Sequence, residues 1–361
     1  MRFFITHILP QNRILKYNQS IAAHLFCYKL IDAHFFDKTY SILPPIAIAK
    51  EELNYERNII PIYSCIRNSP ILYRFAFILE NIYMIYHIPK QSSVWFYNLP
   101  YISILLFWGL KIFKPSVSLN IILLDYTPSQ KGLKGLKEKL LLYSINRSNG
   151  IIKLADSFFV KNSNSICLPG IVSINAIKQP KITTIAKTFL ISGVLGDNIA
   201  MLPMLLEAFS KMPEMQLHIT GKAPDMVLLN RYTQQCNNII YHGLVEYEEY
   251  LRILHDTTFL LSTRNPAALE NQCNFPSKII EGLLHNRIIV STIHYKQLDN
   301  IYYFEVPTTE DCFIKSLYQI IQMPQTELMK YANQAEKVIQ RFNTDVWKTS
   351  MQKIEGYEKR V

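Results

Sequence analysis

A run of ten residues in the C-terminal half contains the side chains best suited to ligand chemistry. The residues that matter in it are Asn274, Phe275, Pro276, Ser277, Lys278 and Glu281. Pro276 is expected at the first position of a helix, where its missing N–H costs nothing. Ser277 and Lys278 then place free backbone N–H groups at the start of that helix, where the helix dipole favours an anion. Glu281 follows one turn later, within reach of a group next to that anion. The run therefore predicts a site for a diphosphate that carries a ribose.

The segments around this run alternate between strands and helices. Residues 268–273 are polar and turn-like, as expected of a loop over a ligand. Short apolar runs predict strands, and apolar residues at helical spacing predict helices. The predicted strands are 188–191, 215–220, 238–241, 258–262 and 288–291, and the predicted helices include 200–210 and 246–255. Strands that alternate with helices predict a doubly wound parallel sheet, followed here by a helical tail from about residue 327.

The N-terminal half has fewer clear signals. Apolar runs at 3–8, 93–97 and 119–124 fit buried parallel strands. Residues 99–113 are strongly apolar, but they are fewer than the roughly 20 that span a membrane and Lys111 interrupts them. We expect a buried helix there, or one in contact with lipid.

Two such halves predict an α/β protein with two Rossmann-like domains that face a cleft, with ligands at the carboxyl ends of the strands. We expect a first, basic domain at 1–175, a linker at 176–187, a ligand-binding domain at 188–340 and a C-terminal helix at 341–361 that returns toward the first domain. Neither half contains a G-x-G-x-x-G motif or a P-loop. The usual sequence support for a dinucleotide-binding or NTPase site is therefore absent.

Charge is unevenly distributed along the 361 residues. The net charge is +10, with +11 in residues 1–180 and −1 in the remainder. A basic half predicts an anionic partner, such as lipid headgroups, a lipid phosphate or nucleic acid. The basic run Lys131, Lys134, Lys137 and Lys139 fits an anionic membrane surface or the phosphate of a lipid-linked acceptor; alternatively, it is a solvated helix face. No nucleic-acid-binding motif accompanies the charge, so we expect no nucleic acid partner.

The cysteines predict neither a metal site nor disulfides. The six cysteines show no metal-like spacing, which is typical of a reduced, cytosolic protein. Met1 begins what looks like a first strand, and we expect no signal peptide. There is no clear D-x-D metal motif, and we expect no metal or other cofactor.

Five segments together resemble a known family. These are 189–193, 205–209, 217–221, 239–243 and 275–281, and they occur in the family's order. They resemble the nucleotide-sugar domain of glycosyltransferases with the GT-B fold, in particular the retaining family 4 group. Segments 125–128 and 168–171 extend the resemblance weakly into the first half. The resemblance implies transfer of a sugar from a nucleotide-diphosphate sugar with retention and without a metal. It also implies that Glu281 binds the ribose and that Gly193 lets the backbone approach the phosphates.

The sequence departs from the family at two places. The family often has two glutamates separated by seven residues, and Cys273 occupies the first of these places here, with Glu270 close enough to compensate. The family's basic pair after the glycine loop is also missing at 195–198, so we expect Arg264 or Lys278 to balance the diphosphate. Asp125 follows a predicted strand and is a candidate polar group near the transferred sugar or acceptor, or else a turn residue.

The residues and the resemblance together predict a peripheral glycosyltransferase on the inner face of the plasma membrane. It would add a sugar to a glycan or lipid-linked acceptor in bacterial surface polysaccharide synthesis. A catalytically silent GT-B protein that binds a partner enzyme and a GT-B sugar-nucleotide epimerase remain alternatives. His7, which follows the first predicted strand, is more simply a structural histidine than an acceptor-side group, and His218 and His242 are expected to be packing residues.

Overall fold

The protein folds into two compact α/β units. The computed structural model describes every residue except 15, 18, 125, 127–133, 174–178 and 357–361. The side chains of residues 21 and 134 are not described either. Unit 1 comprises Met1–Ser173 and Thr344–Val361, and unit 2 comprises Ile174–Asn343. The last helix of the chain thus belongs to the first unit.

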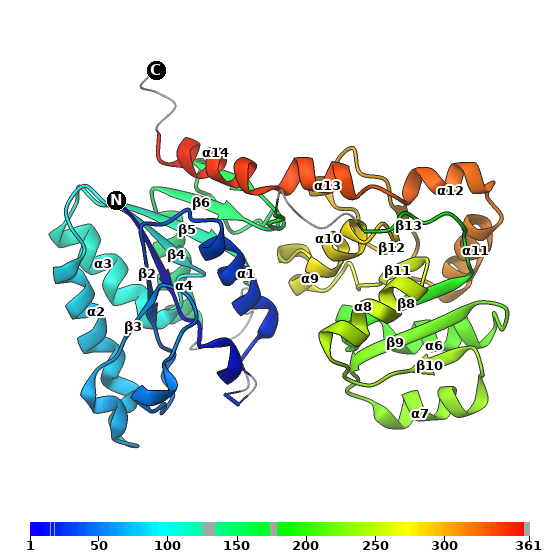
Figure 1. Ribbon diagram of the computed structural model, residues 1–361, viewed down its shortest axis with the longest axis horizontal. Helices are drawn as coiled ribbons and strands as arrows, with labels where there is room; N and C mark the ends of the chain where they lie inside the picture. Colours follow the sequence, from blue (N-terminus) through cyan, green and yellow to red (C-terminus); the bar gives the residue numbers. More distant parts are fainter. Residues whose placement is uncertain (15, 18, 125, 127–133, 174–178, 357–361) are drawn as a thin grey trace. The chain divides into compact units, whose positions relative to one another are not determined.

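Unit 1 is built on a parallel sheet of seven strands (Figure 1). The strand order is β3-β2-β1-β4-β5-β6-β7. The strands are β1 (Arg2–Thr6), β2 (Lys38–Ile42), β3 (Ile59–Ile62), β4 (Ser93–Tyr97), β5 (Ser118–Leu123), β6 (Gly150–Lys153) and β7 (Ser165–Cys167). Every residue of β4 is buried, as expected for a central strand covered on both faces.

Helices cover both faces of this sheet. They are α1 (Ile21–Asp32), α2 (Ala76–His87), α3 (Ile104–Phe113), α4 (Lys134–Asn146) and α14 (Thr344–Ile354). Figure 1 shows α2 and α3 on one side of the sheet and α1 on the other, as right-handed crossovers require when the strand order reverses. Short 3-10 turns join several elements, among them η3 (Cys65–Asn68), η4 (Tyr73–Phe75) and η5 (Tyr101–Ser103).

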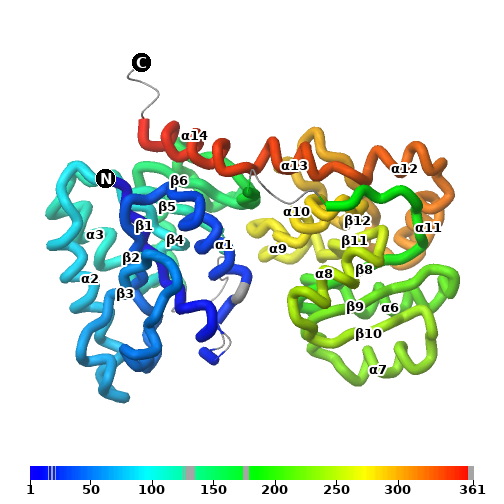
Figure 2. Tube along the Cα trace, in the orientation of Figure 1, coloured from blue at the N-terminus to red at the C-terminus, as the bar shows by residue number. Residues whose placement is uncertain are grey.

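The C-terminal helix α14 is held to unit 1 by packing and by a buried carboxylate. Figure 2 shows α14 beside β6. The Trp347 ring contacts Phe26 of α1, with centroids 5.8 Å apart, and its Nε1 donates to the carbonyl of Gly170 at 2.8 Å. Just after the helix, Glu355 accepts hydrogen bonds from Arg2 and from Trp95 Nε1. Its side chain is 2% exposed, so these partners are needed to keep a charge at this position.

Unit 2 repeats the same architecture with six parallel strands. The strand order is β10-β9-β8-β11-β12-β13. The strands are β8 (Thr188–Val194), β9 (Gln216–Lys222), β10 (Ile239–Tyr241), β11 (Phe259–Ser262), β12 (Ile288–Ser291) and β13 (Phe304–Glu305). The core includes Phe189 of β8, which stacks on Phe259 of β11 with centroids 4.7 Å apart.

The helices of unit 2 form two groups by their contacts. α6 (Leu202–Ser210) packs with α7 (Met226–Gln235) and α11 (Glu310–Ile321), whereas α10 (Ser277–Leu284) packs on β11 and β12 and against α13 (Ala335–Phe342). The other helices are α5 (Asp197–Ala200), α8 (Tyr247–Asp256), α9 (Leu269–Cys273) and α12 (Gln325–Tyr331), and η6 spans Lys296–Leu298. The predicted doubly wound parallel architecture is confirmed in both units.

Several predicted elements differ from those observed. Segment 268–273, predicted as a turn, contains the short helix α9, and the predicted helix 200–210 is interrupted at Met201, whose φ is +48°. Pro276 caps α10 instead of occupying its first turn, because the extended conformation there (ψ 108°) lets Ser277 begin the helix. The clear signals in the first half marked three strands, and the polar strands β2 and β7 were missed.

Candidate functional site

The candidate site lies at the carboxyl ends of the unit 2 strands, where the strand order reverses between β8 and β11. Ligands of doubly wound sheets bind at this position because the loops diverge there and leave a crevice. Hydrogen bonds join the two loops. The carbonyl of Asn198, after β8, accepts from Asn265 N at 3.0 Å and from Asn271 Nδ2 at 2.6 Å. The loop after β8 and the segment after β11 are therefore held together.

Arg264 is held at the end of β11 by backbone and side-chain contacts. Its backbone N–H donates to Thr292 Oγ1 at 2.6 Å, and that hydroxyl donates back to the Arg264 carbonyl at 2.6 Å. Its Nη1 donates to Asn271 Oδ1 at 3.0 Å. These bonds place a half-buried guanidinium at the carboxyl edge of the sheet, where a cation would stabilise an anionic ligand.

Glu281, in the second turn of α10, is the centre of a compact polar cluster. Its carboxylate accepts hydrogen bonds from Tyr247 Oη at 3.2 Å, Tyr250 Oη at 3.0 Å and Lys278 Nζ at 2.7 Å. The two tyrosines project from the first turns of α8, so helices α8 and α10 share the cluster. The Lys278 ammonium also lies 3.8 Å from the centroid of the Tyr250 ring, in a cation–π geometry.

The cluster keeps Glu281 ionised although it is largely buried. Burial by itself would raise the pKa of Glu281, but the charge of Lys278 and the hydrogen bonds from Lys278 and the two tyrosines outweigh burial and lower it. The pKa of Tyr250 is raised by burial first and then by the Glu281 charge, and the pKa of Tyr247 is raised to about 12 for the same reasons. A carboxylate with a low pKa remains a hydrogen-bond acceptor throughout the physiological pH range.

The glycine loop after β8 lies next to this cluster. Ser192 is close to Tyr250, and its hydroxyl opposes the rise in the Tyr250 pKa. Gly193 follows with φ +115°, and no atom lies within 4 Å of the place where its Cβ would be. Gly221 of β9 has φ +120°, and a Cβ there would be 1.9 Å from the Gly193 carbonyl oxygen. The glycine at 221 thus lets the two strand ends approach closely, and open space lies beside Gly193.

The predicted residues before Glu281 lie between the end of α9 and the first turn of α10. Phe275 is buried and packs edge-on against Tyr295, with centroids 5.0 Å apart, and Pro276 is also buried. Ser277 is exposed at the first position of α10, and no side chain caps this end of the helix. Asn274 is partly buried at the C-cap of α9. The first N–H groups of α10 have no helical carbonyl partner and constitute an anion-binding end.

The position of Cys273 bears on sugar recognition. Cys273 is fully buried, and burial raises the pKa of its thiol, whereas Glu270 is partly exposed in the first turn of α9. Of the two, Glu270 is the side chain with access to solvent.

The predicted sites in the N-terminal half lie only partly within the described residues. Asp125 and Lys131 lie outside them, and Lys134 begins α4 without a described side chain. Lys137 and Lys139 are exposed on α4. His7 follows β1; its Nδ1 lies 2.7 Å from the Ile42 carbonyl and its Nε2 3.3 Å from Ser103 Oγ. Burial lowers the pKa of His7 to about 4, although the Ile42 carbonyl opposes this.

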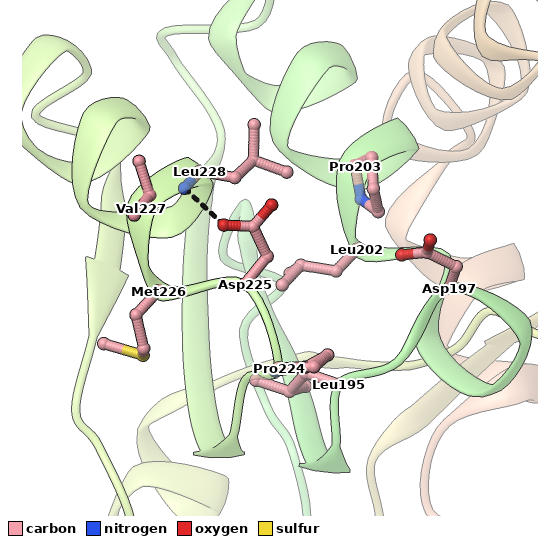
Figure 3. Close-up of a pocket in the computed structure, with 9 residues that line it drawn as sticks. All are labelled: Leu195, Asp197, Leu202, Pro203, Pro224, Asp225, Met226, Val227 and Leu228. Carbon is pink, nitrogen blue, oxygen red and sulfur yellow. Dashed lines mark hydrogen bonds between the residues drawn. The ribbon is translucent and has the colours of Figure 1, made fainter.

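A separate cavity of about 600 Å³ opens between the loops after β8 and β9 (Figure 3). Asp197 and Asp225 contribute carboxylates to its wall, and Asp225 Oδ1 caps α7 by accepting from Leu228 N at 2.8 Å. None of the predicted donor-binding residues lines this cavity. Two carboxylates disfavour a diphosphate, so this cavity is less suited to such an anion than the surroundings of Lys278 and Arg264.

Two findings on metal ions and membranes hold for the described residues. Nowhere in that part of the chain do three histidine, cysteine, aspartate or glutamate side chains come close enough to hold a metal ion. Likewise, none of the described helices has the length and apolar character needed to cross a membrane.

Similarity to known proteins is found among solved structures. No family model matches the sequence, and no curated protein matches it. Among solved structures, HepE from Anabaena in complex with UDP and glucose has a TM-score of 0.64 at 12% identity, covering 100% of this chain and 99% of that one. A glycosyltransferase from Rickettsia africae has a TM-score of 0.63 at 12% identity, covering 99% and 97%. The N-terminal domain of Candida albicans trehalose-6-phosphate phosphatase has a TM-score of 0.67 at 12% identity, covering 98% and 96%.

The chain has the GT-B fold. The evidence is the full-length structural similarity together with two parallel sheets of equivalent strand order and a last helix that packs on the first unit. Within this GT-B architecture, sequence reasoning found Glu281 and Lys278 but missed Tyr247, Tyr250, Asn198 and Asn271. The only local signal for the tyrosines was their spacing of three residues at the start of a predicted helix, which places them on one face.

Proposed function

We propose that this chain is a glycosyltransferase that moves a sugar from a nucleotide-diphosphate sugar to a glycan or lipid-linked acceptor. The observation that carries the proposal is the cluster of Glu281, Lys278, Tyr247 and Tyr250 at the start of α10, at the carboxyl end of a GT-B sheet. HepE, a structural neighbour of the whole chain, holds UDP and glucose, which supports a nucleotide donor.

The proposed donor lies across the start of α10. The free N–H groups at Ser277 and Lys278 bind the diphosphate, and the Arg264 guanidinium and the Lys278 ammonium balance its charge. A carboxylate has about four lone-pair positions. Tyr247, Tyr250 and Lys278 donate to the Glu281 carboxylate. Glu281 can therefore accept one ribose hydroxyl without losing a partner, and it can accept a second if Lys278 turns toward the diphosphate.

The proposed reaction is a substitution at the anomeric carbon with retention and without a metal ion. The bond from this carbon to the diphosphate oxygen breaks, a bond to the acceptor oxygen forms, and the acceptor hydroxyl passes its proton to the leaving diphosphate oxygen. The α10 dipole and the two cations stabilise the charge that develops on the leaving diphosphate. The remaining rate enhancement comes from positioning the acceptor hydroxyl, to which Asp125 is proposed to contribute. We assign no protein nucleophile.

We further propose that the enzyme acts on the inner face of the plasma membrane in bacterial surface polysaccharide synthesis. The net charge of +11 in residues 1–180 supports an anionic surface or an acceptor with a phosphate. Lys137 and Lys139 are exposed on α4 and are available for such a contact. Unit 2 has no comparable excess of positive charge.

A thermal-shift screen tests the donor site. The full chain and its Glu281→Ala variant are heated with UDP, GDP, ADP and CMP and with their common sugar conjugates. A ligand at a hundredfold excess over its Kd stabilises the folded state by roughly 2.7 kcal/mol, or about 5–10 °C for a unit of this size. We expect one nucleoside diphosphate to raise the Tm selectively, and this increase to disappear in Glu281→Ala. Tyr247→Phe is the matched control because it keeps the carboxylate.

A catalytically silent GT-B protein is the second candidate, because the place of the family's first glutamate is occupied by the fully buried Cys273. This candidate predicts no transfer from any sugar nucleotide, even with a crude lipid extract as acceptor. An epimerase would instead convert the sugar nucleotide in the absence of acceptor. Product analysis by mass spectrometry, with and without the extract, therefore distinguishes all three.

A further inference from the structure

Helix α2 of unit 1 exposes an apolar stripe. In a soluble protein the apolar stripe of a surface helix faces the core and the polar face meets water. In α2 the buried residues are Ala76, Glu80, Asn81 and Met84, whereas Leu79, Ile82 and Tyr86 are exposed. Five large apolar or aromatic side chains of this helix are exposed, at positions 78, 79, 82, 83 and 86. Their spacing follows one side of the helix, so they form a continuous stripe.

The polar residues of α2 fix this orientation. Glu80 forms a buried ion pair with Arg67, with Nη2–Oε2 at 2.6 Å, and also accepts from Ser64 N at 2.9 Å. Asn81 Nδ2 donates to the Ile102 carbonyl at 2.6 Å, and its Oδ1 accepts from Leu106 N at 3.2 Å. Rotation of the helix would separate Glu80 from Arg67 and leave the Arg67 guanidinium buried without its charge partner, at a cost of several kcal/mol. The outward apolar stripe is therefore a fixed feature of the fold.

The exposed apolar surface extends beyond α2 in both directions. α3 lies alongside α2, since Gly109 lies directly against the Ile85 side chain and Lys114 Nζ donates to the Tyr86 carbonyl at 3.0 Å. At the end of α3, Ile112 and Phe113 are 65% and 72% exposed. Before η4, Ile71 is 80% exposed. We call the exposed apolar side chains of residues 71–86 and 105–113 the apolar face. Contiguous faces of this kind mark interaction sites with membranes or proteins.

The segments that carry the apolar face have an excess of positive charge. Residues 66–150 contain ten Lys or Arg and three Asp or Glu. Glu80 is buried against Arg67, and Glu138 of α4 is buried and accepts from Tyr126 Oη at 2.9 Å. Within the described part of α2, η4, α3 and α4, no carboxylate is exposed. Arg74 and Lys90 are exposed beside the apolar face. Its surroundings are therefore cationic.

We propose that the apolar face of unit 1 inserts into the interfacial region of a lipid bilayer that contains anionic lipids. Apolar side chains surrounded by cations match the layered chemistry of such a surface, with acyl chains beneath anionic headgroups. The exposed Tyr83 and Tyr86 suit the boundary between the two. A second copy of the chain would instead bring like charges together, which disfavours self-association. The inference rests on the proposed function only in that a lipid-linked acceptor would lie in the same bilayer. The apolar face is a different surface from the lysine run at 131–139.

Vesicle co-sedimentation of the full chain tests the proposal. The vesicles are phosphatidylcholine alone or phosphatidylcholine mixed with phosphatidylglycerol. The wild-type chain is expected to bind the mixed vesicles more tightly. The double variant Leu79→Glu, Ile82→Glu is expected to lower the partition coefficient at least about tenfold, since two apolar contacts are replaced by two repelled charges. Val227→Glu is the matched control, because Val227 is 83% exposed in unit 2, and its binding should stay within about twofold of wild type.

Specific outcomes overturn the proposal. It fails if the wild-type chain does not bind mixed vesicles or if the double variant binds like wild type. It also fails if a concentration-dependent dimer, seen by sedimentation velocity without lipid, is abolished by the double variant, because the apolar face is then an interface between copies. The nucleotide-induced thermal shift is measured on every variant. Vesicle binding that depends on the apolar face in a chain without any nucleotide shift supports this inference and counts against the proposed donor site alone.

Discussion

Alanine at Gly221 should destabilise unit 2 more than alanine at Gly193, although the two residues have nearly the same backbone conformation. Their φ angles are +120° and +115°, and they pair with each other at the ends of β9 and β8, where Ser192 before Gly193 is close to Tyr250 of the Glu281 cluster. They differ in what a new Cβ would contact. At Gly193 nothing lies within 4 Å, whereas at Gly221 the Cβ would be 1.9 Å from the Gly193 carbonyl oxygen. The pair therefore separates backbone strain from a steric clash at one site.

The size of each effect follows from this geometry. A residue other than glycine at such a φ costs about 1–3 kcal/mol, which applies to both variants. At Gly221 the carbonyl of β8 must also withdraw by more than about 1 Å, and forced displacements of this kind cost typically 1–3 kcal/mol more. Gly221→Ala should therefore unfold with about 2 kcal/mol less stability than Gly193→Ala, or about 4–8 °C lower in Tm. Gly196→Ala is the control, since φ is −74° and its Cβ would meet nothing.

Thermal and urea unfolding, followed by circular dichroism, measure these differences. The expected order of stability is Gly196→Ala close to wild type, then Gly193→Ala, then Gly221→Ala. Equal stability of the Gly193 and Gly221 variants would refute the close approach of the two strand ends. The apparent Kd for the nucleotide found in the screen adds a functional readout. We expect Gly193→Ala to weaken it, because the new methyl group occupies the space left for phosphate.

Three further predictions concern charged and titrating groups. Lys278→Met removes the main cation that lowers the pKa of Glu281. In the wild-type chain this lowered pKa stabilises the fold above the unfolded value of about 4.5, and the stabilisation is lost as the pH falls. Acid unfolding of the variant, measured by circular dichroism, should therefore begin at a higher pH than that of the wild type. Burial lowers the pKa of His7 from 6.5 to about 4. As the pH falls between these values, the unfolded state takes up the proton first, and the free energy of unfolding decreases by at most about 3 kcal/mol. His7→Asn should flatten this decline, as measured by urea midpoints. Glu355→Ala leaves Trp95 and Arg2 without their acceptor and should cost about 3–5 kcal/mol in urea unfolding, whereas an unchanged midpoint would contradict the role assigned to α14.

The parts of the fold that were predicted are those with strong local patterns. Strands 93–97 and 288–291 were predicted with the observed bounds, because continuous apolar runs between polar segments indicate buried strands. β2 was missed because the polar residues Lys38, Thr39 and Ser41 interrupt the apolar pattern that would indicate a buried strand. Its burial depends on a distant partner, since Ser41 Oγ donates to the Ile8 carbonyl at 2.7 Å. A strand of this kind becomes recognisable only when its neighbours in the sheet are known.

The residues of the candidate site also include some that were predicted from local patterns and some that were not. Lys278 and Glu281 were identified from their positions at a helix start, and the structure places them in one cluster. Tyr247 and Tyr250 join this cluster from a helix more than 25 residues earlier in the chain. Asn198, in a separate set of hydrogen bonds, contacts Asn265 and Asn271 from more than 60 residues earlier. These partners were not predictable, because their approach depends on how α8, α10 and the strand ends pack.

The sequence by itself determined the class of each well-patterned element and the alternation that gives two parallel sheets. These properties depend on residues two to four positions apart in the chain. Only the tertiary structure decided which residues complete the Glu281 cluster and which side of α2 meets solvent. In α2 the buried Arg67–Glu80 pair fixes the helix with its apolar stripe outward. Breaking such a buried pair costs about 3–5 kcal/mol, and no local pattern encodes which residues form it.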